Sequence, residues 1–326
     1  MVNKVKMIAF GPVPSRRLGH SLGINNIPPK ICTYSCVYCQ VGRTINMQVK
    51  RKSFYKPEEV IHEVVKKIRE AKNIGEPVDY LTFVPDGEPT LDVNLGNEIE
   101  LLKTLGIKIA VITNSSLIWK EEVRNELGGA DWISLKIDAV TENIWGKINR
   151  PHGSLKLDEI LHGISEFANA FKGALTTETM ITQDVNDNLE EMDKVSDFIA
   201  KIKPNKSYIA IPTRPPAEKY IEPPTEQVIN MAHQIFMEKS IPTEYLIGYE
   251  GNAFAFTGNV ENDLLSITSV HPMREDGVKE LLDKAEANWN IIEKLIHEDK
   301  LTEVKYKNEK FYVRKLLGSK RNNTAY

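Results

Sequence analysis

Residues 32–39 read Cys-Thr-Tyr-Ser-Cys-Val-Tyr-Cys and contain all three cysteines of the chain, Cys32, Cys36 and Cys39. An odd number of clustered thiols argues against a disulfide framework and indicates a site for a soft metal, either zinc or iron–sulfur. A structural zinc ion needs a fourth protein ligand, for which His20 or His62 is available, but neither has a usual finger spacing. A four-iron cluster normally takes four thiolates, so three would leave one iron open for chemistry. We therefore predict an open 4Fe-4S cluster on these cysteines, with zinc as the alternative.

The composition is that of an ordinary globular protein. The chain has 326 residues, enough for one large and one small domain, with 41% apolar and 27% charged residues, which argues against disorder. Its net charge of -3 argues against a strongly basic nucleic-acid binder but allows a local basic patch. No apolar run is long enough to span a membrane, and the first residues do not form a secretory signal. The prediction is a cytoplasmic protein without membrane contact.

Strand and helix patterns alternate along most of the chain. The predicted strands cover 18–24, 80–84, 108–113, 132–137, 174–180 and 206–211. The predicted helices cover 56–72, 97–105, 120–127, 157–171, 188–202 and 225–239, with Asn188 and Thr225 as caps of the last two. Such alternation predicts a parallel sheet with right-handed crossovers. Six units are too few for a complete barrel, so we predict a partial (β/α)6 TIM-like barrel over residues 1–250.

Polar residues gather where the predicted strands end, and in a parallel barrel these ends form one rim that carries the chemistry. The cysteine loop follows the first strand, and Asp86 to Thr90 follow the second. The later strands end in Thr113 to Ser116, in Ser134, Lys136 and Asp138, in Glu178 and Thr179, and in Pro212 to Arg214. This agreement predicts a single site on that rim.

The cysteine stretch resembles the cluster loop of the radical S-adenosylmethionine superfamily, in which the open iron is chelated by the amino and carboxylate groups of S-adenosylmethionine. The resemblance implies the same partial barrel and a low-potential electron donor of flavodoxin or ferredoxin type. It also implies that Tyr38, the residue before the last cysteine, lies near the adenine. Packing of Tyr38 on the barrel wall is the alternative.

Further cofactor contacts are implied by the same resemblance. Asp86-Gly87-Glu88-Pro89 is similar to the superfamily's Gly-Gly-Glu-Pro segment, whose backbone and Glu accept hydrogen bonds from the methionine ammonium; Glu88 could instead cap the next helix. Lys136 resembles a basic residue that neutralises the methionine carboxylate in glycyl-radical-enzyme activases, with an ion pair to Asp138 or Glu178 as the alternative.

The remaining cofactor-binding residues come from other strand ends. The resemblance implies ribose contacts for Asn114 and Ser134, an acidic position at the fifth strand for Glu178, and packing of Pro212 on the adenine. Satisfaction of backbone groups or a plain strand end is the alternative for each. All the cofactor contacts predicted here precede Thr213.

The N-terminal segment from Gly11 to Gly19 narrows the resemblance to a group of radical enzymes related to the wyosine-type tRNA synthetases, over residues 8–250. Arg16 and Arg17 would grip a phosphate or carboxylate of the substrate at the mouth of the site, or else pack against acidic neighbours. The tRNA-modifying relatives hold a second cluster with extra cysteines that this chain lacks. The wyosine reaction is therefore not expected to transfer.

The last part of the chain predicts a second unit. Helices at 262–270, 274–285 and 290–298, then strands at 301–306 and 311–316, predict a winged helix-turn-helix domain over 259–318, followed by a flexible tail at 319–326. Residues 300–326 hold eight Lys or Arg against two Glu. The presumed recognition helix nevertheless exposes Glu293 and Glu298, which do not suit phosphate. Docking of a macromolecule or a structural role is therefore favoured over nucleic-acid binding.

Together these patterns predict a radical enzyme that cleaves S-adenosylmethionine reductively to methionine and a 5′-deoxyadenosyl radical. The radical would abstract hydrogen from a substrate that the sequence does not identify, either RNA, a protein or peptide, or a metabolite. The alternative is a nucleic-acid-binding regulator that senses redox state through its iron–sulfur cluster. Glu88, Lys136 and Glu178 distinguish the two, because a sensor needs no amino-acid-binding pocket.

Overall fold

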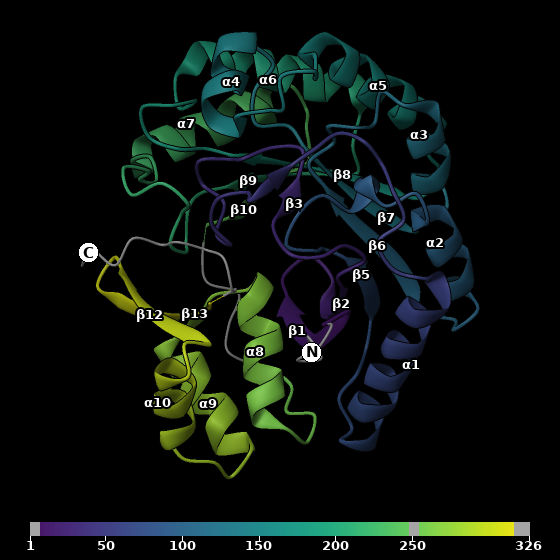
Figure 1. Cartoon of the computed structure of the whole chain (residues 1–326). Helices are drawn as coiled ribbons and strands as arrows, with labels where there is room; N and C mark the ends of the chain where they lie inside the picture. The colour runs from purple at the N-terminus through teal and green to yellow at the C-terminus, as the bar shows by residue number, and fades with distance from the viewer. Residues whose placement is uncertain (1–6, 248–253, 316–326) are drawn as a thin grey trace.

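The computed structural model describes residues 7–247 and 254–315, and these contain an eight-stranded sheet in the order β1-β2-β5-β6-β7-β8-β9-β10. The seven strands from β2 to β10 run parallel, and β1 is antiparallel to β2. The sheet curls into a half-barrel with helices on its outer side (Figure 1). The strands are β1 (Ala9–Ser15), β2 (Gly19–Ile24), β5 (Tyr80–Phe83), β6 (Lys108–Thr113), β7 (Trp132–Lys136), β8 (Ala174–Met180), β9 (Lys206–Ala210) and β10 (Thr243–Leu246).

The helices of the barrel cover the convex face of the sheet, in the crossovers between parallel strands. They are α1 (Pro57–Asn73), η1 (Pro89–Leu91), α2 (Leu95–Lys103), α3 (Glu121–Leu127), α4 (Glu142–Asn149), α5 (Leu157–Ala170), α6 (Leu189–Ile202) and α7 (Glu226–Glu238). Both predicted caps are confirmed: the side chain of Asn188 accepts from Glu191 N, and that of Thr225 accepts from Val228 N.

The predicted partial TIM-like barrel with six strand–helix units is confirmed: the units run from β2 with α1 to β9 with α7. Two further strands of the sheet, β1 and β10, are not predicted from the sequence. The seventh parallel strand, β10, has four residues of which one is buried, so it shows neither an apolar run nor an alternation. Strand β1 contains a glycine and two prolines and is bulged between Phe10 and Val13, which hides its pattern from sequence analysis. Helix α4 has only eight residues and contains Gly146, and the sequence analysis missed it as well.

The two faces of the sheet have different roles. Side chains that point outward, such as Val111, Ile133 and Leu135, belong to the large core that packs against the helices. Because side chains alternate along a strand, the neighbouring positions point into the half-barrel. On β7 these are Trp132, Ser134 and Lys136, so the inner face changes from apolar to charged toward the carboxyl end of the strand.

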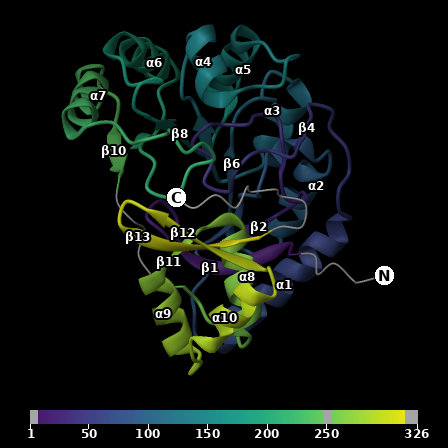
Figure 2. The same ribbon diagram turned by 60° about the vertical axis from the view of Figure 1, so that its left-hand side comes forward.

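The C-terminal unit has its own core and its own sheet, in the order β11-β13-β12. Its elements are α8 (Val260–Val270), β11 (Met273–Arg274), α9 (Glu275–Lys284), α10 (Asn290–His297), β12 (Leu301–Tyr306) and β13 (Glu309–Arg314). The unit packs through α8 against β1, as Figure 2 shows, and Lys67 of α1 donates to Asp263 of α8 at 3.0 Å. The winged-helix assignment stays a prediction, and the predicted tail lies outside the described residues.

A buried carboxyl on α2 generates a prediction about stability. Burial and the nearby Asp92 raise the pKa of Glu98 to about 9, from an ordinary value of 4.5. The folded protein therefore keeps a proton that the unfolded chain releases, and this contribution to stability is present below about pH 4.5 and lost as pH rises toward 9. Glu98→Gln stays neutral, so its stability relative to the wild type should rise between pH 5 and pH 8, by on the order of 3 kcal/mol.

Urea unfolding of both proteins at the two pH values measures this difference. Glu100→Gln is the matched control, because Glu100 lies exposed on the same helix and should show no such pH dependence. An equal stability difference for Glu98→Gln at pH 5 and pH 8 would contradict the assignment.

Candidate active site

A cavity of about 300 Å³ opens at the carboxyl ends of the parallel strands. All three cysteines line it. It is also lined by eight of the ten cofactor- and substrate-binding residues predicted from the sequence: Arg16, Arg17, Tyr38, Gly87, Asn114, Lys136, Glu178 and Pro212. Glu88 and Ser134 do not line it. Most of the residues that were predicted to share one site on this rim therefore line the same cavity.

The cysteine loop crosses the inner side of the half-barrel. Cys32 ends β3 (Ile31–Cys32), a short strand that pairs with β4 (Asn46–Met47), and the other two cysteines follow in an irregular turn. Burial raises the pKa of all three thiols, that of Cys36 to about 12. The side-chain amides of Asn114 and Asn149 lie 3.4 Å from the sulfurs of Cys32 and Cys36, respectively. Amide donors aimed at sulfur suit thiolates that ligate iron.

The two histidines considered as zinc ligands lie elsewhere. His20 lies near the N-terminal end of β2, where it contacts Asp79, and His62 belongs to α1. Neither histidine lines the cavity. Within residues 7–247 and 254–315, no three His, Cys, Asp or Glu side chains converge as ligands of a single metal ion. Among the described residues, no histidine lines the cavity beside the three thiols as a fourth ligand.

Gly87 allows the segment after β5 to pack directly against the cysteine loop. A Cβ atom at this position would lie 1.9 Å from the carbonyl oxygen of Ile31, so any side chain would displace the backbone. The amide of Glu88 donates to the same carbonyl at 3.2 Å, and the amide of Lys30 donates to Asp86 O at 2.7 Å. The glycine therefore brings the backbone of residues 86–88 beside Cys32.

Glu88 itself turns away from the cavity. Its fully buried carboxylate accepts from Thr90 N at 3.1 Å, from the Thr113 hydroxyl at 2.6 Å and from Asn114 N at 2.7 Å. Burial raises the pKa of Glu88, although these hydrogen bonds oppose the shift. The carboxylate caps η1, as in the capping alternative given for Glu88 above. It also connects the end of β5 to the end of β6.

Ser134 also lies away from the cavity wall. It is buried in the middle of β7, paired with Ile112 and Thr176 and two residues before the end of the strand. Only Lys136, at the carboxyl end of this strand, reaches the cavity. The ribose contact of Ser134 stays a prediction.

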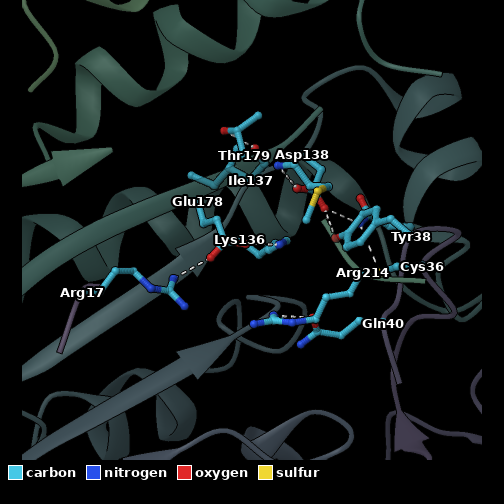
Figure 3. A network of polar contacts seen from close by, with 12 residues as sticks. Arg17, Cys36, Tyr38, Gln40, Lys136, Ile137, Asp138, Glu178, Thr179 and Arg214 are labelled. Atoms are coloured by element: carbon cyan, nitrogen blue, oxygen red, sulfur yellow. Dashed lines mark hydrogen bonds and ion pairs between the residues drawn. The ribbon is translucent and has the colours of Figure 1, made fainter. Parts of the chain in front are cut away.

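Glu178 stands between two cations on the cavity wall (Figure 3). Its carboxylate accepts from Arg17 Nη1 at 2.5 Å and from Lys136 Nζ at 2.5 Å. Burial raises the pKa of Glu178, but the two cations outweigh it and lower the pKa to about 2. For Lys136 burial lowers the pKa, and the carboxylates of Glu178 and Asp138 raise it above its usual value. Glu178 and Lys136 are therefore both charged at neutral pH.

Tyr38 joins this charged group to the cysteine loop. Its hydroxyl donates to Asp138, which also accepts from Asn149 Nδ2 at 2.8 Å, and Lys136 Nζ lies 4.9 Å from the centre of the Tyr38 ring. Asp138 is predicted on the rim without a cofactor role, and Asn149 is not predicted from the sequence. Asn149 lies in a helix with no motif around it, and its contact with Cys36 spans 113 residues of chain.

Comparison with known proteins agrees with this geometry. The family model described as "Radical SAM superfamily" matches residues 26–199, which is more than half of the chain. The chain belongs to the radical SAM superfamily. The UPF0026 protein MJ1312 of Methanocaldococcus jannaschii is 51% identical over 317 residues, covering 97% of this chain and 98% of that protein. The UPF0026 protein slr1464 of Synechocystis is 36% identical over 216 residues, covering 65% and 78%.

The fold is also similar to that of solved structures. A radical SAM methyltransferase from Sphaerobacter thermophilus superposes with a TM-score of 0.55 at 14% identity, covering 70% of this chain and 66% of that one. The protein is thus a radical SAM enzyme of the UPF0026 group with a partial barrel. None of the helices in the described residues is both long and apolar enough to cross a membrane.

The C-terminal unit of this radical SAM enzyme reaches the active-site cavity. Val270 at the end of α8 lines it, and the Gln40 side chain lies 3.4 Å from the Val270 carbonyl. The Tyr306 hydroxyl donates to Pro212 O at 3.1 Å, and Arg214 donates to Gln40 at 2.8 Å. The cavity wall therefore extends beyond Thr213, whereas all the predicted cofactor contacts precede that residue.

The charged group generates a second prediction. Glu178→Gln leaves Arg17 and Lys136 without their shared carboxylate, so the free energy of unfolding at neutral pH should fall by on the order of 3 kcal/mol. Because the folded pKa is lowered to about 2, this stabilisation is present above about pH 4.5 and lost as pH falls toward 2. Denaturant unfolding at several pH values should show the two proteins converging in acid.

Glu190→Gln is the control, since Glu190 forms an exposed pair with Lys194 on α6 and should change stability little. A loss for Glu178→Gln that is no larger than the control, or that does not shrink in acid, would show that Glu178 does not hold the two cations.

Proposed function

We propose that the protein binds a 4Fe-4S cluster through Cys32, Cys36 and Cys39 and binds S-adenosylmethionine in the same cavity. When bound, these groups would supply reductive cleavage of the sulfonium to methionine and a 5′-deoxyadenosyl radical, which takes hydrogen from a substrate. The observation that carries the proposal is that all three thiols of this radical SAM enzyme line one cavity with charged and aromatic side chains. The remaining residues of the cavity wall would bind and orient S-adenosylmethionine and shield the radical from water.

We assign the amino-acid end of S-adenosylmethionine to the charged side of the cavity. Lys136 would neutralise the methionine carboxylate, because it is a cation on the wall close to the Tyr38 ring. Backbone acceptors around Gly87 would take the ammonium, since the Glu88 carboxylate is already engaged by four donor groups from Thr90, Thr113 and Asn114. Glu178 would orient Lys136 and Arg17, and its low pKa keeps it ionised while it does so.

The nucleoside end would lie among the less charged groups. Tyr38 and Pro212 line the cavity and would flank the adenine, and Asn114, which also lines it, would lie beside the ribose. Val270 from the C-terminal unit would help to exclude water from the radical. In this arrangement the protein contributes position and a dry site, while the bound groups contribute the chemistry.

The substrate would enter past Arg16, an exposed side chain on the cavity wall. Its guanidinium suits a phosphate or carboxylate of an RNA or of a protein or peptide. The side chain of Arg17 is only 12% exposed, so of the two predicted substrate-binding arginines we assign the contact to the exposed Arg16. A C-terminal unit with winged-helix element order would dock the macromolecule.

The alternative function, a redox-sensing regulator, has one feature in its favour, the order of elements in the C-terminal unit. A sensor, however, has no use for a cavity whose wall carries Lys136, Glu178 and Arg17 beside the thiols. This wall makes the enzyme the better proposal.

The enzyme is tested by anaerobic reconstitution with iron and sulfide, followed by dithionite and S-adenosylmethionine. The wild type should show cluster absorbance and form 5′-deoxyadenosine, and Cys36→Ala should lose both almost completely because one of three ligands is gone. Ser35→Ala is the matched control, since this neighbouring side chain does not line the cavity and should leave both signals intact. Full iron content and activity in Cys36→Ala would contradict the ligand assignment, and a wild type without 5′-deoxyadenosine would contradict the enzyme.

A further inference from the structure

Two arginines beside the cysteine loop converge on one carboxylate. Arg43 donates to Glu218 at 2.9 and 2.7 Å, and Arg150 Nη1 donates to the same carboxylate at 2.5 Å. The side chain of Arg43 is 69% exposed, whereas that of Glu218 is 8% exposed. One buried negative charge therefore supports two cations, and the surface keeps an excess of positive charge.

This cationic surface is attached directly to the cysteine loop. The amide of Glu218 donates to Val37 O at 3.0 Å, and Val37 follows Cys36. The amide of Ser35 lies 3.2 Å from Arg150 O. Arg43 follows Cys39 by four residues, so both arginines belong to segments that touch the backbone between or beside the cysteines.

The residues around these two arginines are of types that are common at protein–protein interfaces. Tyr220, whose hydroxyl accepts from Arg150 Nη2 at 3.0 Å, is 62% exposed, and Ile45 is also exposed. Lys147 in the last turn of α4 is exposed and precedes Ile148, whose carbonyl accepts from Val37 N at 2.9 Å. Tyr and Arg are enriched at protein interfaces, whereas exposed ion pairs contribute little to folding. The folded chain gains little from exposing these groups, which indicates a role in binding.

We propose that Arg43, Ile45, Lys147, Arg150 and Tyr220 form a docking face for a small acidic one-electron carrier that reduces the cluster. This inference depends on the proposed function, since it requires a cluster on the cysteines. One electron leaves the reduced carrier and enters the cluster, and no proton moves and no bond breaks in that transfer. The face lies against the loop that holds the cluster, opposite in charge to the carrier, so electrostatic attraction steers a brief encounter of small area.

The test compares two sources of electrons. The variant is Arg43→Glu/Lys147→Glu, and the control is Lys194→Glu/Lys201→Glu, which makes the same change in net charge on exposed positions of α6. Rates of 5′-deoxyadenosine formation are measured with dithionite and with flavodoxin kept reduced by its reductase and NADPH. We expect equal dithionite rates in all three proteins and a loss of about tenfold or more in the flavodoxin-driven rate of the docking-face variant alone. High salt should lower the wild-type flavodoxin rate and narrow this difference.

Three results would overturn the proposal. The first is a flavodoxin-driven rate that falls no further in the docking-face variant than in the control. The second is a wild type that responds to dithionite but to neither flavodoxin nor ferredoxin. The third is an unchanged flavodoxin rate together with lost RNA binding, which would assign the face to nucleic acid. A wild type that forms no 5′-deoxyadenosine even with dithionite contradicts the proposed function itself, and the docking face with it.

Discussion

Hydrogen bonds to the end of α4 hold the cysteine loop, and the site depends on them. The amides of Ser35 and Val37 donate to the carbonyls of Asn149 and Ile148, at 3.0 and 2.9 Å. Residues 33–39 contain no helix or strand of their own that would fix the thiols. On the other side, Gly87 lets the segment after β5 lie against Ile31. The loop is thus held between two crossovers of the barrel, and its thiols face the cavity because both neighbours are in place.

The charges of the cavity are ordered by the protein itself. Glu178 holds Arg17 and Lys136 at 2.5 Å each, and the Asp138 carboxylate holds the Tyr38 hydroxyl. Such preorganisation means that a charged ligand meets groups already oriented, so little reorganisation is needed when it binds. The barrel makes this possible because the carboxyl ends of neighbouring parallel strands place residues 136 and 178 side by side, in register on β7 and β8.

The sequence predicts the barrel well because its parallel strands are buried apolar runs between amphipathic helices. It fails at β10 and α4, whose short patterns fall below what periodicity can detect. The positions of Lys136 and Glu178 at strand ends could be predicted, whereas the direction of the Glu88 carboxylate could not. That direction is set by Thr113 and Asn114 on the next strand. Asn149 likewise gains its role only through a contact across the fold, which leaves no local signal.

Mössbauer spectroscopy of the protein reconstituted with ⁵⁷Fe tests the central claim most directly, because it resolves individual irons of a cluster. With three thiolate ligands, one iron of a four-iron cluster lacks a protein ligand and is free to bind S-adenosylmethionine. The account predicts a 4Fe-4S spectrum in which adding S-adenosylmethionine changes the parameters of one iron and leaves the other three unchanged. A spectrum without such a cluster, or one that S-adenosylmethionine does not alter, would contradict it.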